Sequence, residues 1–411
     1  MTAPVTTRPA PPPSTGRRSW ARDHLFSTWY NGLFTVLFGG VLAALTIALV
    51  RAIATADLTI LRVNLTLFMV GQFPRDQLWR PAAAVVLTGV LFGVTAGSMR
   101  ATGAERAAEA GLLFHVTSWR EVTRRFWPLI ALVIVILSLT GTVTPALIVL
   151  GTVVFGVGSM YVGKALPRSV RKRLWLIVMV LLAAIYLVLA GFGGVGWEDW
   201  GGLHLNLFLT VAGILLAFPF GLLLAIGRRS QMPVIRGISV TYIELVRGVP
   251  LITILLFGAF AIGFLLPEGL RPSLVTRMLV AIVAFEAAYV AEVVRGGLQA
   301  VPPGQVEASQ SLGMPGLKTT RLIVLPQALR ATIPAMVGQF ISLFKDTTLV
   351  AVLGVLELLE AAFIANSQPD FFGKELIGVT LGFAGLVFWV GSYTMSREAR
   401  RLEKKLGVGE R

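Results

Sequence analysis

A carboxylate stands near the middle of one of the long apolar stretches of this chain. Glu286 follows the apolar run 281–285, and no basic residue lies three or four positions from it. An ionisable side chain within a membrane span costs roughly 2.5–3.5 kcal/mol on insertion scales, so its presence needs a reason. Two roles fit Glu286: it could face a cavity and bind an ammonium group, or it could accept hydrogen bonds from a neighbouring helix.

A second set of polar residues interrupts another apolar stretch. Asp346, Thr347 and Thr348 follow Lys345 directly. Irregular backbone at membrane depth is tolerated only where protein or a water-filled cavity covers it. We therefore expect these residues to line a polar path, with Glu286 as the first candidate.

Two further carboxylates each have an arginine three positions later. The pairs are Glu244 with Arg247 and Glu292 with Arg295. Residues at this spacing share one face of a helix. The pattern predicts structural ion pairs, within a helix or between helices, at one end of the spans.

One polar stretch, residues 302–327, lies between two apolar segments. Pro302 and Pro303 suit the first turn of a helix, where a missing N–H costs nothing. Gly313 suits the left-handed position that ends a helix, and Pro315 starts a second short one. The sequence predicts a helix–turn–helix hairpin in water.

The composition is that of a polytopic membrane protein. The 411 residues are 55% hydrophobic and only 14% charged, whereas a soluble domain has about a quarter charged residues. The net charge of +15 arises from basic residues in short loops between apolar segments, as the positive-inside rule expects. Membrane topology explains this charge better than a nucleic-acid partner does.

A membrane span needs about twenty apolar residues. The uncharged run 128–163 is too long for one span, and Thr140–Pro145 would break it into a hairpin. With two spans there, most Lys and Arg residues fall on the cytoplasmic side together with both chain ends. We thus expect about ten spans: 31–50, 81–99, two within 128–163, 174–193, 205–226, 250–266, 278–299, 331–366 (interrupted) and 376–395.

Glycines recur one turn apart in two of these spans. Gly89, Gly93 and Gly97 lie in the second span, and Gly378 and Gly382 lie in the last. Small residues at this spacing let helices approach closely. We expect them to serve helix packing.

No pattern for a metal, a nucleotide or a catalytic site stands out. The chain has no cysteine, and its histidines, His24, His115 and His204, are scattered singly. The segment 158–165 approaches a phosphate-binding Walker A loop. It lacks the hydroxyl that holds magnesium and ends a membrane span instead of following a strand. We expect no ATP site and no catalytic residue in this chain.

The polar hairpin also resembles the "EAA loop" of ABC importer permeases. All spacings of that signature are present, and Ser309 replaces the second alanine. In that family the loop is a coupling helix that docks in a groove of the ATP-binding cassette subunit. The resemblance implies this role for Glu307, Ala308, Ser309, Gly313, Ile323, Leu325 and Pro326.

Three more segments resemble the histidine/glutamine (polar amino-acid) permeases of that family. They are Glu244–Leu251, Ala288–Gln299 and Lys345–Val350, in the family's order. The preceding 200 residues hold extra spans, an arrangement similar to the long permeases of general L-amino-acid systems.

The resemblance implies a type I ABC importer permease fold in residues 201–396, with the coupling loop at 302–327. Residues 1–29 are then a disordered cytoplasmic tail, 30–200 an extra region of about five spans, and 397–411 a basic cytoplasmic tail. The expected partners are an ATPase subunit carrying ATP and magnesium, a second permease (identical or related) and a periplasmic or lipid-anchored amino-acid-binding protein. The expected place is a prokaryotic inner membrane. An ion-coupled secondary amino-acid transporter is the alternative, for which Glu286 and Asp346 would serve.

Overall fold

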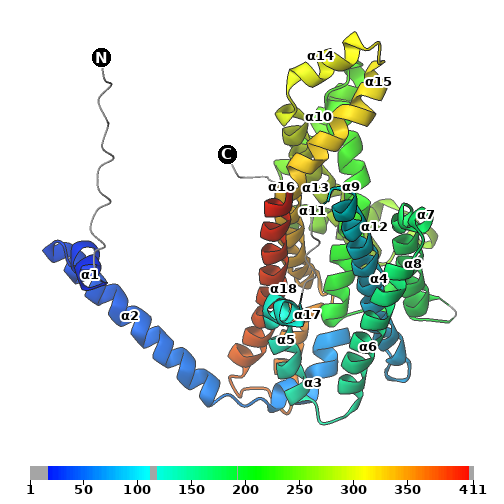
Figure 1. Ribbon diagram of the computed structural model, residues 1–411. Helices are drawn as coiled ribbons and strands as arrows, with labels where there is room; N and C mark the ends of the chain where they lie inside the picture. The colour runs from blue at the N-terminus through cyan, green and yellow to red at the C-terminus, as the bar shows by residue number, and fades with distance from the viewer. Residues whose placement is uncertain (1–16, 112–117, 192, 407–411) are drawn as a thin grey trace, which may run out of the picture. The chain divides into compact units, whose positions relative to one another are not determined.

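The computed structural model describes residues 17–111, 118–191 and 193–406, and these form two compact units divided after Asp57 (Figure 1). The described residues are helical and contain no β-strand, apart from an isolated bridge between Gly202 and Glu357. The predicted all-α class is confirmed.

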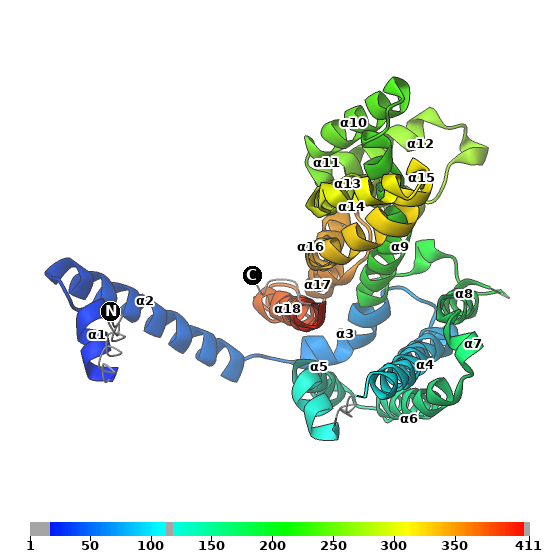
Figure 2. The same ribbon diagram turned by 45° about the horizontal axis from the view of Figure 1, so that its top comes forward.

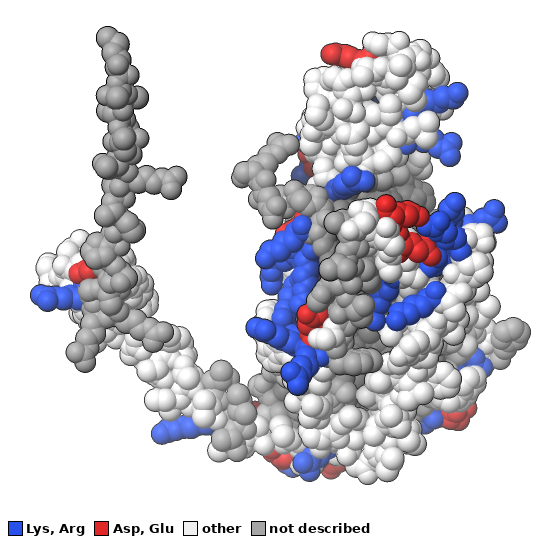
Figure 3. Space-filling view, in the orientation of Figure 1, with Lys and Arg blue, Asp and Glu red and all other residues white. Residues whose placement is uncertain are grey.

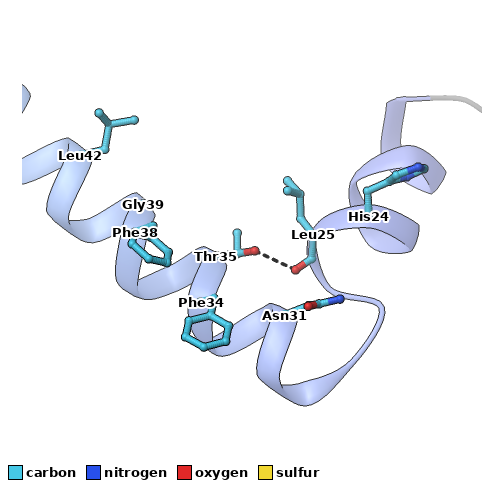
Figure 4. A pocket seen from close by; sticks show the side chains of 8 residues that line it. All are labelled: His24, Leu25, Asn31, Phe34, Thr35, Phe38, Gly39 and Leu42. Carbon is cyan, nitrogen blue, oxygen red and sulfur yellow. Dashed lines mark hydrogen bonds between the residues drawn. The ribbon is translucent and has the colours of Figure 1, made fainter. Parts of the chain in front are cut away.

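The first unit contains α1 (Arg17–Leu25) and α2 (Trp29–Ala54). The hydroxyl of Thr35 donates to the backbone oxygen of Leu25 at 2.8 Å, which holds the two helices together. A largely apolar notch of about 390 Å³ lies beside this contact (Figure 4). The prediction of a disordered tail up to residue 29 is therefore wrong for residues 17–25, and residues 1–16 lie outside the described part.

The second unit holds most of the expected spans. Within the described residues, eight helices of the chain, α2 included, are long and apolar enough to cross a membrane. A ninth span results if two helices bent by 107° at Gly248–Pro250 count as one. The long helices of this unit are α4 (Trp79–Glu109), α5 (Trp119–Leu139), α6 (Thr144–Ala165), α9 (Gly202–Arg228), α13 (Leu274–Ala300), α16 (Leu325–Asp346) and α18 (Ile377–Leu406).

The bent span consists of α10 (Pro233–Arg247), α11 (Leu251–Leu256), the π-helix η3 (Phe257–Ala261) and α12 (Ile262–Leu265). The tenth expected span is α8 (Leu174–Ala190), which at 17 residues is shorter than a full crossing. The shorter elements are α3 (Thr59–Val70), η1 (Arg75–Gln77), α7 (Arg168–Arg171), η2 (Trp197–Asp199), η4 (Glu268–Leu270), α14 (Pro303–Ser311), α15 (Gly316–Thr319), the π-helix η5 (Thr320–Val324), η6 (Thr347–Leu353) and α17 (Leu358–Ser367).

Two predicted breaks are confirmed. α5 ends at Leu139 and α6 begins at Thr144, so the run 128–163 is a hairpin. The interrupted span 331–366 is α16, then the 3₁₀ segment η6, then α17. Gly354 ends η6 in the left-handed region, with φ 73°, which suits a residue without a Cβ.

From Leu58 on, the region before residue 200 belongs to the same compact unit as the helices that follow it. α3 packs against α9 and α17, and α5 packs against α18 (Figure 2). The amides of Asn64 and Gln368 exchange hydrogen bonds at 2.7 and 3.1 Å. Asn64 is buried. Its hydrogen bonds with Gln368 therefore hold the 12-residue helix α3 against the end of α17. The part of the extra region from Leu58 on thus shares one core with the last helices.

α4 and α6 pack closely against each other. A Cβ added to Gly93 would collide with the backbone oxygen of Gly156 and the hydroxyl of Ser159, and one on Gly97 would collide with the Met160 oxygen. The hydroxyl of Ser98 donates to the Gly163 oxygen at 3.2 Å. The packing role predicted for the glycines of this span is confirmed.

The same prediction is wrong for α18 within this chain. A Cβ at Gly378 or Gly382 would meet no atom within 4 Å, and both residues are exposed.

We predict that Gly93→Ala lowers the stability of the protein by about 1–3 kcal/mol, because the added methyl group overfills a tight helix contact. Gly158→Ala is the matched control, since a Cβ there meets open space. The thermal unfolding midpoint of each variant in detergent measures the effect. An equal midpoint for both variants would contradict the α4–α6 contact.

Candidate functional site

The polar hairpin has the predicted geometry. α14 begins with Pro303 at its first position, and Gly313 follows its end with φ 73°. The N–H of Gly313 donates to the Gln310 oxygen at 2.8 Å, and the N–H of Met314 donates to the Ser309 oxygen at 3.1 Å. These two bonds are the Schellman pattern that ends a helix with a left-handed glycine. α14 and α15 protrude together at one end of the second unit (Figure 1).

A buried pair of hydroxyls joins the two short helices. Ser309 is 1% exposed and Thr319 is 3% exposed, and their oxygens lie 2.9 Å apart. The Ser309 hydroxyl also donates to the Val306 oxygen at 2.7 Å, which leaves Thr319 as the donor between the two hydroxyls. Every polar atom of the pair is then satisfied, as burial requires. We call this contact the hydroxyl clasp.

The outer face of the hairpin is apolar and open. Glu307 and Ala308 are exposed, and Leu312, Leu317 and Leu322 expose 81%, 82% and 62% of their surface. Exposed aliphatic side chains of this kind are typical of surfaces that contact another protein or the membrane. The sequence analysis did not single out these three leucines, whose interval of five residues matches no helical face.

The hairpin continues without a break into a membrane span. After Pro315, helical backbone runs through α15, the π-turn η5 and α16. Ile323 and Leu325 are half-buried at the junction, and Pro326 stands in the first turn of α16. A displacement of the hairpin therefore moves α16.

A shared carboxylate connects three helices near the hairpin. Glu292 on α13 accepts from Arg295 at 2.9 Å and lies 3.7 Å from both Arg228 of α9 and Arg247 of α10. Glu244 pairs with Arg228 at 2.8 Å. The four residues predicted as ion pairs thus belong to one network, but Glu244 takes Arg228 as its partner, and Arg247 turns toward Glu292 and the ring of Tyr289.

Glu286 is enclosed between two spans. It is 1% exposed, and the amide of Gln339 on α16 donates to both of its carboxylate oxygens, at 3.0 and 3.2 Å. These hydrogen bonds agree with the second of the two roles left open above, that of an acceptor for a neighbouring helix.

The polar residues at the end of α16 and directly after it differ in burial. Thr347 is fully buried and accepts a hydrogen bond from Asn206 of α9 at 3.0 Å. Asn206 also donates to the buried carboxylate of Glu357 at 2.9 Å. Asp346 and Thr348 are half-buried, and the hydroxyl of Thr348 donates to the Lys345 oxygen. Sequence reasoning missed Asn206 and Glu357, because their hydrogen-bond partners lie on elements far away in the sequence.

These features define an all-α, multi-pass membrane protein with a protruding two-helix hairpin. The chain belongs to the family of binding-protein-dependent transport system inner membrane components, whose profile matches residues 217–407.

The similarity extends over the whole chain in two curated relatives. The inner membrane amino-acid ABC transporter permease protein YhdY of Escherichia coli is 33% identical over 98% of this chain and 96% of its own length. The glutamate/glutamine/aspartate/asparagine transport system permease protein BztC of Rhodobacter capsulatus is also 33% identical, over 97% and 96%. The probable glutamine permease protein GlnP of Bacillus subtilis, at 37% identity, matches only 50% of this chain but 91% of its own length. The predicted resemblance to long amino-acid permeases is therefore confirmed.

We predict that Gln339→Leu destabilises the protein by about 1–3 kcal/mol, because it leaves a buried carboxylate without its donor. The double variant Glu286→Met/Gln339→Leu should regain most of this loss, since two apolar groups replace the polar pair. Thermal unfolding in detergent gives both values. A double variant less stable than the single one would refute a purely structural pair.

For the hydroxyl clasp we predict an asymmetry. Ser309→Ala removes the acceptor of a buried hydroxyl on Thr319, whereas Thr319→Val leaves Ser309 bonded to Val306. Hydrogen–deuterium exchange of α14 and α15 should therefore speed up more in Ser309→Ala, by a factor corresponding to about 1 kcal/mol. Adding Thr319→Val to Ser309→Ala should partly reverse the effect. Equal exchange in both single variants would contradict the clasp.

Proposed function

We propose that this chain is the permease subunit of a binding-protein-dependent ABC importer for amino acids. The observation that carries this proposal is the protruding hairpin, rigid by its Schellman turn and hydroxyl clasp and continuous with α16. Such an element converts a push from a partner into movement of a span. The names of the whole-length relatives support amino acids as the cargo.

The partner at the hairpin is an ATPase subunit, which binds ATP and magnesium and hydrolyses the nucleotide. The exposed Glu307, Ala308, Leu312 and Leu317 form the face that it contacts. A second permease subunit, identical or related, and a periplasmic or lipid-anchored binding protein complete the assembly. Under this proposal the hairpin, both chain ends and the basic loops are cytoplasmic, in a prokaryotic inner membrane.

Alternating access follows from this arrangement. Closure of two ATPase subunits moves the hairpins, and each α16 moves with α13, to which it is bound through Glu286 and Gln339. The network around Glu292 keeps α9 and α10 in step with α13. The half-buried Asp346 and Thr348 remain our candidates for lining the substrate path. The buried Glu286 and Thr347 would hold the surrounding helices in position through their hydrogen bonds.

We predict that Gly313→Ala reduces uptake per ATP hydrolysed several-fold, because an alanine at φ 73° costs about 1–2 kcal/mol and reorients the hairpin. Gly304→Ala is the matched control, since Gly304 lies within α14 and a Cβ there meets open space. Glu307→Lys should abolish uptake while the protein remains in the membrane. The measurement is amino-acid uptake and ATP hydrolysis by the complete importer in proteoliposomes.

Two outcomes bear on the proposal as a whole. Normal uptake in both Gly313→Ala and Glu307→Lys would refute the coupling role. Uptake that needs no ATP and stops when the proton gradient is dissipated would show that the protein is an ion-coupled transporter and not an ABC importer.

A further inference from the structure

An arginine cluster lies where the beginning of α5 meets the end of α18. Arg397 donates to the backbone oxygens of Arg124 and Arg125, at 3.0 and 3.3 Å. Arg125 in turn donates through Nε to the carboxylate of Glu398 at 2.8 Å. These contacts draw like charges from two distant parts of the chain together. The α5–α18 arginine cluster comprises Arg124, Arg125, Arg397, Arg400 and Arg401.

The acidic residues nearby do not balance this charge. Glu398 accepts from both Arg125 and Arg401, whereas Arg397 binds backbone oxygens and Arg400 binds the hydroxyl of Ser396. Residues 120–125 and 397–404 together contain seven basic side chains and three acidic ones. Lys and Arg side chains gather visibly over this side of the second unit (Figure 3). The cluster therefore presents an excess of positive charge to an anion.

The cluster lies toward the polar ends of α5 and α18, both of which are long and apolar enough to cross a membrane. Trp127, one turn beyond Arg124, is 49% exposed; on α18, Trp389 is 53% exposed and stacks on Tyr393 at 5.2 Å. Exposed Trp and Tyr side chains are typical of the membrane–water interface. Arg400 stands seven residues, two helical turns, beyond Tyr393 and so lies above the same face of α18.

We propose that the α5–α18 arginine cluster binds the headgroup of an anionic phospholipid. Its phosphate sits between the exposed Arg124 and Arg400, and its acyl chains run along the exposed aromatic side chains below. Guanidinium groups suit phosphate oxygens because they donate two parallel hydrogen bonds. Basic pockets between spans are known lipid sites.

The bound lipid would join the extra region to the permease module, since α5 belongs to the first and α18 to the second. Arg397 and Glu398 already hold the two helices together, and a headgroup would neutralise the charge that this contact brings together. The inference does not depend on which solute the protein transports.

The test is native mass spectrometry of the full chain, titrated with dioleoyl phosphatidylglycerol in mild detergent. Each basic residue near an anionic surface contributes about 1 kcal/mol, so Arg124→Gln/Arg400→Gln should weaken phosphatidylglycerol binding about thirtyfold. The matched control is Lys172→Gln/Arg173→Gln, the same charge change at two exposed residues between α7 and α8, which should leave this binding unchanged. Arg124→Lys/Arg400→Lys keeps the charge and should bind within about fivefold of the native chain.

If both glutamine double variants bind phosphatidylglycerol equally weakly, the proposal is overturned, because the lipid is then attracted by the overall positive charge and not by this cluster. Equal binding of dioleoyl phosphatidylcholine would overturn it as well. Displacement of the lipid by millimolar inorganic phosphate would assign the cluster to a free anion instead. If the glutamine pair fails to fold, the lysine pair decides, and loss of phosphatidylglycerol from a folded lysine pair refutes the site.

Discussion

The absence of water in the bilayer core is the constraint on which this structure depends. A buried polar group there must find its partner inside the protein. Gln339 supplies that partner for Glu286, and Asn206 supplies it for Glu357 and Thr347. Each of these bonds joins two different helical elements. Polar groups that would be costly if unpaired therefore set how α9, α13, α16 and α17 meet.

The proposed coupling role rests on a second set of bonds, in the hairpin. The hairpin is closed by backbone bonds at Gly313 and by the clasp of Ser309 and Thr319, and it runs on as α16. Exposed ion pairs contribute only about 0–1 kcal/mol each, so the partly exposed network around Glu292 adds little stability. The network instead fixes the relative positions of the helices, because the carboxylate of Glu292 keeps arginines from α9, α10 and α13 close together.

From Leu58 on, the extra region is part of the permease core. α3 is too short to cross a membrane, yet Asn64 and Gln368 bind it to the end of α17, and Phe68 packs on Phe383 of α18. α4 and α6 contact through glycines and small polar residues, which permits close approach where no hydrophobic effect drives association. The full-length similarity to YhdY and BztC fits this shared core.

The sequence by itself determined the features that depend on neighbouring residues. Proline at the start of α14 and glycine after its end specify the hairpin through their allowed backbone angles, and the lengths of the apolar runs specify most spans. Family motifs then predicted a coupling segment and, correctly, the resemblance to amino-acid permeases.

Only the tertiary structure decided which side chains pair across helices. Spacing along α10 favoured Arg247 as the partner of Glu244, but the way α10 lies against α9 brings Arg228 to it instead. Glu286 meets Gln339, 53 positions away, and the amide of Asn206 reaches a carboxylate 151 positions away. The physical reason is that such contacts depend on how each helix is rotated about its axis and on the angle at which helices cross. The periodicity of a single helix determines neither quantity.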